Sequence, residues 1–238
     1  MTSSNSRKPP KYKYKIILDI DKDAWNWYDG CNSTYSGVDW KQRIPENIYE
    51  NIHGKSKKEA LVFLIPFLKQ KYIDEKNLID ACTNFINREY EQKFEKACQK
   101  VADLLNKPIY RDDFTIYLTT FPRGPYRYQQ GSLWFMIEWI DPVKNFLHEL
   151  LHFQFTHYWW KPDTEVGRLN DNDFHYLKES LTVILDEDFY PLIKSPDGGY
   201  EIHKEFRQEL HKFWKTNKDF DKLVKFGLKI LPKFVNNK

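Results

Sequence analysis

Residues 148–152, near the middle of the chain, carry the pattern His-Glu-x-x-His. Residues four apart on an α-helix lie on the same face, so the imidazoles of His148 and His152 can reach one metal ion. Glu149 would then lie beside the open position of that metal, where a carboxylate acts as a base and not as a ligand. The spacing therefore predicts a zinc site that activates a water molecule.

A catalytic zinc ion takes three protein ligands, so the two histidines need a third donor. Glu179 is the preferred residue, because it lies within a predicted helix among apolar neighbours, where an unpaired carboxylate would be costly. His157 is the competitor, but on an unbroken helix it falls about half a turn out of phase with His148. Asp186 and Glu187 are further alternatives, near the predicted end of the same helix as Glu179.

Two predicted helices position these side chains. The first spans about residues 142–158, with Asp141 as the N-cap and Pro142 in the first turn, where its missing N–H costs nothing. This helix is apolar nearly all round, which indicates that it is buried. The second spans about residues 174–185 and is expected to be capped by residues 171–173.

The remaining segments predict an α+β fold that is mainly helical with a small mixed β-sheet. Alternating and β-branched residues predict strands at about 12–20, 114–118 and 133–137. Apolar residues at helical spacing predict further helices at about 57–72, 75–105, 201–215 and 218–228. Residues rich in Gly, Pro and Asn predict loops at about 21–45 and 119–132.

The arrangement of these segments resembles the gluzincin branch of zinc metallopeptidases, the thermolysin-like group. In that group, His-Glu-x-x-His on one helix is completed by a Glu on the next, and the resemblance covers about residues 133–186. The resemblance implies a zincin-like fold with an active-site helix and a glutamate helix. It also implies that His148, His152 and Glu179 bind zinc and that Glu149 handles the proton.

One position departs from the pattern of that group. Gluzincins often carry an Asp one turn after the glutamate ligand to support a histidine, and this chain has Val183 there. Support for the histidine is therefore expected from another part of the chain. The metzincin branch fits less well, because its Gly turn is missing and Tyr158 occupies the position of its third His.

The resemblance also implies groups that contact the substrate. A Tyr or His downstream of the glutamate helix usually stabilises the oxyanion in these enzymes, and Tyr190, Tyr200 and His203 are the candidates here. The strand at 133–137 resembles the edge strand on which these enzymes bind an extended peptide by main-chain hydrogen bonds.

Composition sets the remaining expectations. The chain has 238 residues, a formal net charge of +3 and three cysteines without a Cys-x-x-Cys pair. The weak charge gives no argument for nucleic acid, and no run of about 18 apolar residues predicts a membrane span. A cytoplasmic, monomeric protein with reduced thiols is expected, with a flexible tail at 1–12. The rest is expected to form one domain, 13–238, with an upper part to about 158 and a lower helical part from about 159.

The leading prediction is a zinc-dependent peptidase that acts on a peptide or protein substrate. The alternative is a non-catalytic module that binds a peptide or protein on the same scaffold. A third interpretation, a helical structural protein with an accidental motif, would require the buried histidines and Glu179 to have other partners. Glu149 favours the enzyme, since a binding module does not need that carboxylate. The basic run 215–238 is interpreted as a helix with one packed face.

Overall fold

The computed structural model of the chain describes residues 12–33 and 39–235. Three parallel strands confirm the predicted ones: β1 (Lys13–Leu18), β2 (Asp113–Thr119) and β4 (Ser132–Met136). Their pairing is supported by the β-branched and aromatic residues that the three segments share. The predicted tail at 1–12 lies outside the described residues except for Tyr12, which is buried.

A fourth strand, β3 (Tyr126–Arg127), pairs antiparallel with β4 and forms the edge of the sheet. The prediction that β4 is the edge strand is therefore wrong, because β4 lies between β2 and β3. The chain reverses between β3 and β4 through a 3-10 turn and Gly131, whose φ of +59° suits glycine. A two-residue strand leaves no alternating pattern in the sequence, so it was predicted as loop.

The predicted helices are confirmed to within a few residues, apart from the ends of α6. Before the sheet is completed the chain forms α3 (Lys57–Asp74) and α4 (Lys76–Leu105). After β4 it forms α5 (Pro142–Tyr158), α6 (Asp171–Leu181), α7 (Leu185–Asp188), α8 (Lys204–Asn217), α9 (Phe220–Ile230) and α10 (Pro232–Val235). The predicted helix at 174–185 begins earlier, because Asn170 is its cap, and a 3-10 turn at Thr182–Ile184 separates α6 from α7.

The loop predicted at 21–45 is wrong over residues 21–32, which belong to α1 (Ile20–Asn32), and its residues 34–38 lie outside the described residues. Helix α2 (Glu46–Ile52) follows the predicted loop. The side chain of Asp19 caps α1 by accepting from two backbone N–H groups. The buried face of α1 includes Asp23 and Asn26, and these polar residues interrupt the apolar repeat that identifies a helix in sequence. Asp23 accepts hydrogen bonds from Thr119 and Thr120 at the end of β2, which fixes α1 against the sheet.

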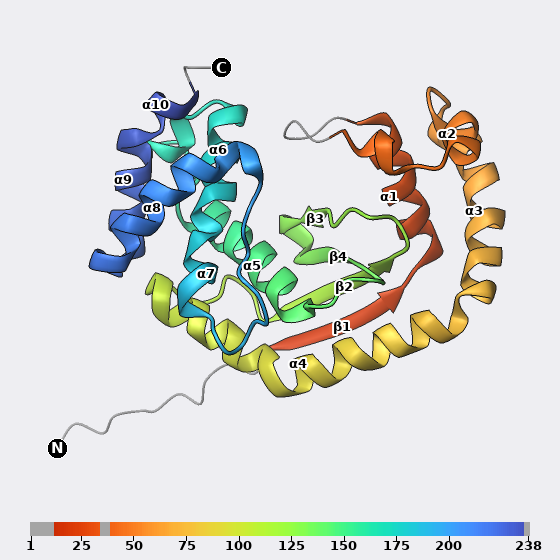
Figure 1. Cartoon of the computed structure of the whole chain (residues 1–238), viewed down its shortest axis with the longest axis horizontal. Coiled ribbons are helices and arrows are strands. Elements are labelled where there is room, and N and C mark those ends of the chain that lie inside the picture. The colour runs from red at the N-terminus through yellow and green to blue at the C-terminus, as the bar shows by residue number, and fades with distance from the viewer. Residues whose placement is uncertain (1–11, 34–38, 236–238) are drawn as a thin grey trace.

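Two hydrophobic clusters of described residues lie at the two ends of the sheet. Figure 1 shows α5 to α10 grouped at one end, α1 to α3 at the other, and the long α4 passing beneath the strands. The larger cluster joins the sheet and α4 to the C-terminal helices, with members from Tyr12 to Leu231. The smaller cluster joins α1, α2 and α3 with Phe121. The three cysteines are free and buried.

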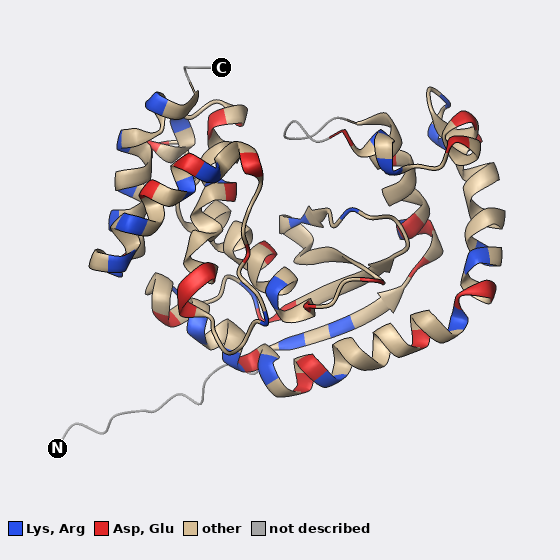
Figure 2. Cartoon of the chain, viewed as in Figure 1, with Lys and Arg blue, Asp and Glu red and all other residues tan. Residues whose placement is uncertain are grey.

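Helices α8 and α9 pack their apolar faces, and most of their charged residues, Arg207 excepted, lie outside that packing. Phe220, Leu223 and Val224 of α9 are buried, which confirms the packed face predicted within 215–238. Figure 2 shows Lys and Arg on the outer turns of α8 and α9, with Asp and Glu between them on α8. Of the helices that the structure describes, none is long and apolar enough to cross a membrane.

Candidate metal centre

Helix α5 carries the His-Glu-x-x-His residues into the interior. Its N-cap Asp141 accepts from the backbone N–H of Lys144 at 3.1 Å, and Pro142 begins the first turn, as predicted. His148 and His152 lie one turn apart with their ring centroids 4.4 Å from each other. His152 is 1% exposed, so the apolar helix buries its imidazole almost completely.

Helix α6 brings the third predicted ligand to the two histidines. The Oε2 atom of Glu179 lies 3.5 Å from His148 Nε2 and 3.3 Å from His152 Nε2. One ligand atom from each of the three residues can be chosen so that all lie within 4.8 Å of one another. Both ring nitrogens of His152 are buried and make no hydrogen bond. Since such atoms are costly to leave unsatisfied, the cluster fits a bound cation, and its donor set is one that can hold a metal ion.

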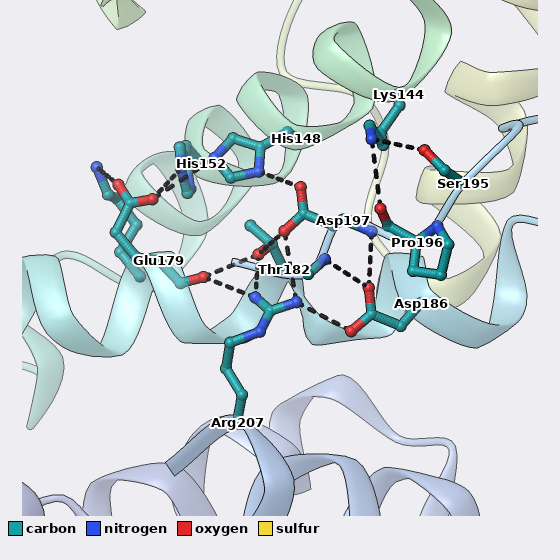
Figure 3. A network of polar contacts seen from close by, with 12 residues as sticks. Lys144, His148, His152, Glu179, Thr182, Asp186, Ser195, Pro196, Asp197 and Arg207 are labelled. Carbon is teal, nitrogen blue, oxygen red and sulfur yellow. Dashed lines mark hydrogen bonds and ion pairs between the residues drawn. The ribbon is translucent and has the colours of Figure 1, made fainter. Parts of the chain in front are cut away.

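His148 has a partner on the side away from Glu179. Its Nδ1 lies 2.8 Å from Oδ1 of Asp197 (Figure 3). Because a carboxylate only accepts, the Nδ1 of His148 donates, and Nε2 is left to face the Glu179 side. Burial would raise the pKa of the Asp197 carboxyl, but His148 and Arg207 hold it well below its usual range. Asp197 thus supplies the histidine support that Val183 cannot.

The loop that carries Asp197 is fixed on both sides. Oδ2 of Asp197 lies 2.7 Å from the hydroxyl of Thr182 and 3.4 Å from Nη2 of Arg207. Lys144 of α5 donates to Ser195 Oγ and to the carbonyl of residue 196, as Figure 3 shows. The contacts come from Lys144 of α5, Thr182 of the 3-10 turn after α6 and Arg207 of α8. Together they hold the Asp197 carboxylate toward His148.

Two glycines make this loop possible. Gly198 and Gly199 have φ values of +72° and +67°, in the left-handed region that favours glycine. A Cβ at Gly199 would also lie 2.7 Å from the Cδ of Arg207. Asp186 accepts from the backbone N–H of Asp197 at 2.8 Å and pairs with Arg207 at 3.0 Å. The Asp-Gly-Gly sequence indicates a turn, but it does not show that the carboxylate of Asp197 reaches His148.

Lys178 is a further residue that the sequence did not identify. It is only 2% exposed, and its Nζ lies 3.1 Å from Oε1 of Glu179 and 2.5 Å from the hydroxyl oxygen of Tyr126. The two oxygens of Glu179 therefore face different partners: Oε2 faces the histidines and Oε1 faces the ammonium group. Burial would raise the pKa of Glu179, but His152 and Lys178 lower it far below its usual value.

Glu149 lies on the cleft side of α5. Its Oε2 is buried and has no hydrogen-bond partner among the described residues. Burial raises the pKa of the Glu149 carboxyl to about 7, although the neighbouring His148 opposes this shift. A carboxylate with such a pKa can both accept and release a proton near neutral pH.

A cleft of about 730 Å³ lies beside the edge strand β3 and opens onto His148, Glu149 and Glu179. Its lining comes from both ends of the molecule, because α1 and the turn after it contribute as well as α5 and α6. Four tryptophans line it: Trp25, Trp40, Trp134 and Trp139. A volume of this size lies within the range of ligand-binding clefts, and the tryptophans give it a partly apolar wall.

The three predicted oxyanion residues lie in different places. Tyr200 lines the cleft and is 41% exposed. His203 is 4% exposed, and its ring contacts that of Tyr176 at 4.5 Å. Tyr190 is 75% exposed and does not contribute to the cleft lining. Only Tyr200 of the three thus lies in the cleft.

The alternative ligands lie elsewhere. His157 Nδ1 is 2.7 Å from the hydroxyl of Tyr128, on the far side of α5 from the cluster. Glu187 forms an ion pair with His211 at 3.3 Å. His175 lines the cleft one turn before Glu179, and its buried Nδ1 has no hydrogen-bond partner among the described residues.

In comparisons of the chain with protein families, curated proteins and solved structures, no match is found. The interpretation of the site therefore depends on its own geometry.

Proposed function

We propose that the protein is a zinc-dependent peptidase. The proposal rests on one observation: the Nε2 atoms of His148 and His152 converge with Oε2 of Glu179 at 3.5 and 3.3 Å. Two imidazoles and one carboxylate are a ligand set of catalytic zinc sites, in which a fourth position stays open. The arrangement on two successive helices also resembles that of the gluzincins, and a zincin-like fold is part of the proposal.

A zinc ion held there would polarise the scissile carbonyl and make a water molecule acidic enough to react near neutral pH. Glu149 accepts the proton of the attacking water, since its buried carboxylate is unpartnered and lines the cleft. Glu149 then donates that proton to the leaving amine. Asp197 keeps the imidazole of His148 in one tautomer and orientation through the bond to Nδ1.

The edge strand β3 supports a peptide as the substrate. Tyr126 and Arg127 of this strand line the cleft, directly beside the metal ligands. The side of β3 away from β4 is the free edge of the sheet, where an extended peptide can add by main-chain hydrogen bonds. We place the bound peptide along β3, and not along β4.

The test is metal analysis combined with digestion of a peptide library, with and without a chelator. We expect about one zinc per chain and hydrolysis that the chelator stops. Glu149→Gln should keep the zinc and lower the rate by at least about 10²-fold, since it removes the general base. Glu187→Gln is the matched control, because Glu187 lies outside the cleft.

Full activity of Glu149→Gln with zinc bound would contradict the proposed role. A protein that binds zinc and peptides but never cleaves them would instead support the alternative, a non-catalytic binding module.

A further inference from the structure

We propose that the hydroxyl of Tyr126 donates the hydrogen bond that stabilises the oxyanion, and that Lys178 orients this hydroxyl from behind. The inference rests on the proposed peptidase function. The sequence predicts this donor among residues that follow the glutamate helix. Tyr126 lies instead on the edge strand β3.

The contact between Lys178 and Tyr126 fixes which of the two groups donates. A lysine ammonium group has three N–H donors and no acceptor, so Lys178 must donate in its 2.5 Å contact with the Tyr126 oxygen. The phenolic hydrogen of Tyr126 is then directed to a different acceptor. Within the described residues, no protein acceptor for that hydrogen is found, and both Tyr126 and Lys178 line the cleft. The O–H of Tyr126 is therefore available to a substrate.

Tyr126 lies next to a proposed metal ligand. The ring of Tyr126 lies 5.8 Å from that of His152, between centroids, and 5.4 Å from that of Phe153. Tyr126 is therefore beside a metal ligand and on the strand along which we place the peptide. The Nζ of Lys178 contacts both the Tyr126 hydroxyl, at 2.5 Å, and Oε1 of Glu179, at 3.1 Å, so this hydroxyl also lies near the third proposed ligand.

Lys178 brings a positive charge to the hydroxyl of Tyr126. The ammonium group of Lys178 is buried and ion-paired with Oε1 of Glu179 at 3.1 Å. A cation that donates to a phenol oxygen draws electrons from the O–H bond and makes that group a stronger donor. Pre-oriented donors of this kind stabilise the charge that develops in the transition state more than they stabilise the substrate.

Tyr200 is the competing residue, and the two differ in how they are held. Tyr200 follows the glycines of the Asp197 loop and is 41% exposed. Within the described residues its hydroxyl makes no hydrogen bond, whereas the hydroxyl of Tyr126 is fixed by a buried lysine. An oxyanion donor needs a fixed position before the reaction starts, which favours Tyr126.

The experiment compares Tyr126→Phe, Tyr200→Phe and Glu149→Gln with the wild type on one peptide found in the library digest. Tyr126→Phe should lower kcat by about 10²- to 10³-fold, leave KM within a few-fold and keep the zinc content. Tyr200→Phe tests the competing residue, and a larger loss of kcat there than in Tyr126→Phe would overturn the assignment. Tyr190→Phe is the matched control, because Tyr190 is exposed and does not line the cleft, and it should match the wild type in kcat. Lys178→Met should lower kcat with Tyr126 intact, and Lys178→Arg should recover part of the loss.

Binding of a phosphonate peptide, which mimics the tetrahedral transition state, gives a second measurement that does not require turnover. Tyr126→Phe should weaken this binding by the same factor as kcat/KM, while binding of an uncleaved substrate analogue stays unchanged. If Tyr126→Phe keeps full kcat and full phosphonate affinity while Glu149→Gln is inactive, the assignment of Tyr126 is wrong and the peptidase function stands. If Glu149→Gln is also fully active, both fall.

Discussion

His148 and Glu179 are each held from behind by a charged residue that a bound metal would not displace. Asp197 accepts from Nδ1 of His148, and Lys178 pairs with Oε1 of Glu179. His152 is held differently: its Nδ1 has no hydrogen-bond partner among the described residues, and its Nε2 lies 3.3 Å from Oε2 of Glu179 within a buried ring. The three ligand atoms are thus oriented toward one position before a metal ion binds. This preorganisation lowers the entropy cost of binding the ion.

Removal of Glu179 tests the ligand set at this scale. Glu179→Ala should abolish tight zinc binding, because two histidines alone leave the site one protein ligand short. Chelator competition measures the affinity, with Glu187→Ala as the control outside the cleft. Undiminished affinity in Glu179→Ala would remove this residue from the site.

Asp197 is tested separately. Asp197→Asn should weaken zinc binding by about 10- to 100-fold, because a neutral amide supports the His148 imidazole less well than a carboxylate does. The same competition measures it, with the exposed Asp163→Asn as the matched control. Equal affinities of the two variants would show that the 2.8 Å contact does not tune the histidine.

At the scale of elements, the predictable parts are those whose apolar residues repeat. Helix α5 was predicted with its bounds and cap because its sequence is apolar nearly all round and opens with Asp-Pro. Glu179 of α6 was predicted as the third ligand because an unpaired carboxylate among the apolar neighbours of that helix would be costly. Helix α1 was missed because Asp23 and Asn26 lie on its buried face, and β3 because two residues carry no period.

Asp197 could not be identified for a different reason. It reaches His148 through a loop whose path depends on Gly198, Gly199 and Arg207, and no local pattern states where such a loop goes. Lys178 was missed because a lysine on an amphipathic helix is normally solvated, and only the fold places its ammonium group against Tyr126.

Asp23 is the residue that fixes α1, so its removal tests that element. Its carboxylate accepts from Thr119, Thr120 and Tyr72 and is fully buried. Asp23→Asn should lower the free energy of unfolding by about 1–3 kcal/mol, because the amide places a donor against donors. Urea denaturation measures it, with the exposed Asp112→Asn as the control.

The difference in stability between the wild type and Asp23→Asn should also depend on pH. Burial raises the pKa of Asp23, with the hydrogen bonds opposing it, so the folded state holds this proton more tightly than the unfolded chain does. The stability from Asp23 is then complete below the unfolded pKa of about 3.9 and is lost as pH rises through the folded pKa. The advantage of the wild type over Asp23→Asn should shrink over that range. An advantage that grows with pH would contradict the raised pKa.

For the whole molecule, the cleft is built from two bodies of packed residues. Trp25 and Trp40 come from the end formed by α1 to α3, and His148 and Glu179 come from the C-terminal helices. The proposed ligands all belong to the second body, on α5 and α6, so the metal site does not depend on α1. The first body supplies one wall of the cleft.

Removal of a bound zinc ion should lower the free energy of unfolding of the whole protein. Because zinc binds only the folded chain, free zinc at about 1,000 times its Kd adds about 4 kcal/mol to the free energy of unfolding. Chelation should lower the Tm of the wild type and of Glu149→Gln equally. Glu179→Ala should show no zinc-dependent shift, and a shift as large as that of the wild type would contradict the assignment.

The adjacent Lys178 and Glu179 also define a signature for recognising related chains. Successive residues on a helix point about 100° apart, so exchanging the two would preserve composition and charge but turn the carboxylate away from the histidines. The order Lys-Glu therefore carries information that the composition does not. A helix with Lys-Glu, after a helix with His-Glu-x-x-His and before an Asp-Gly-Gly turn, is a short pattern by which remote relatives with this centre could be found.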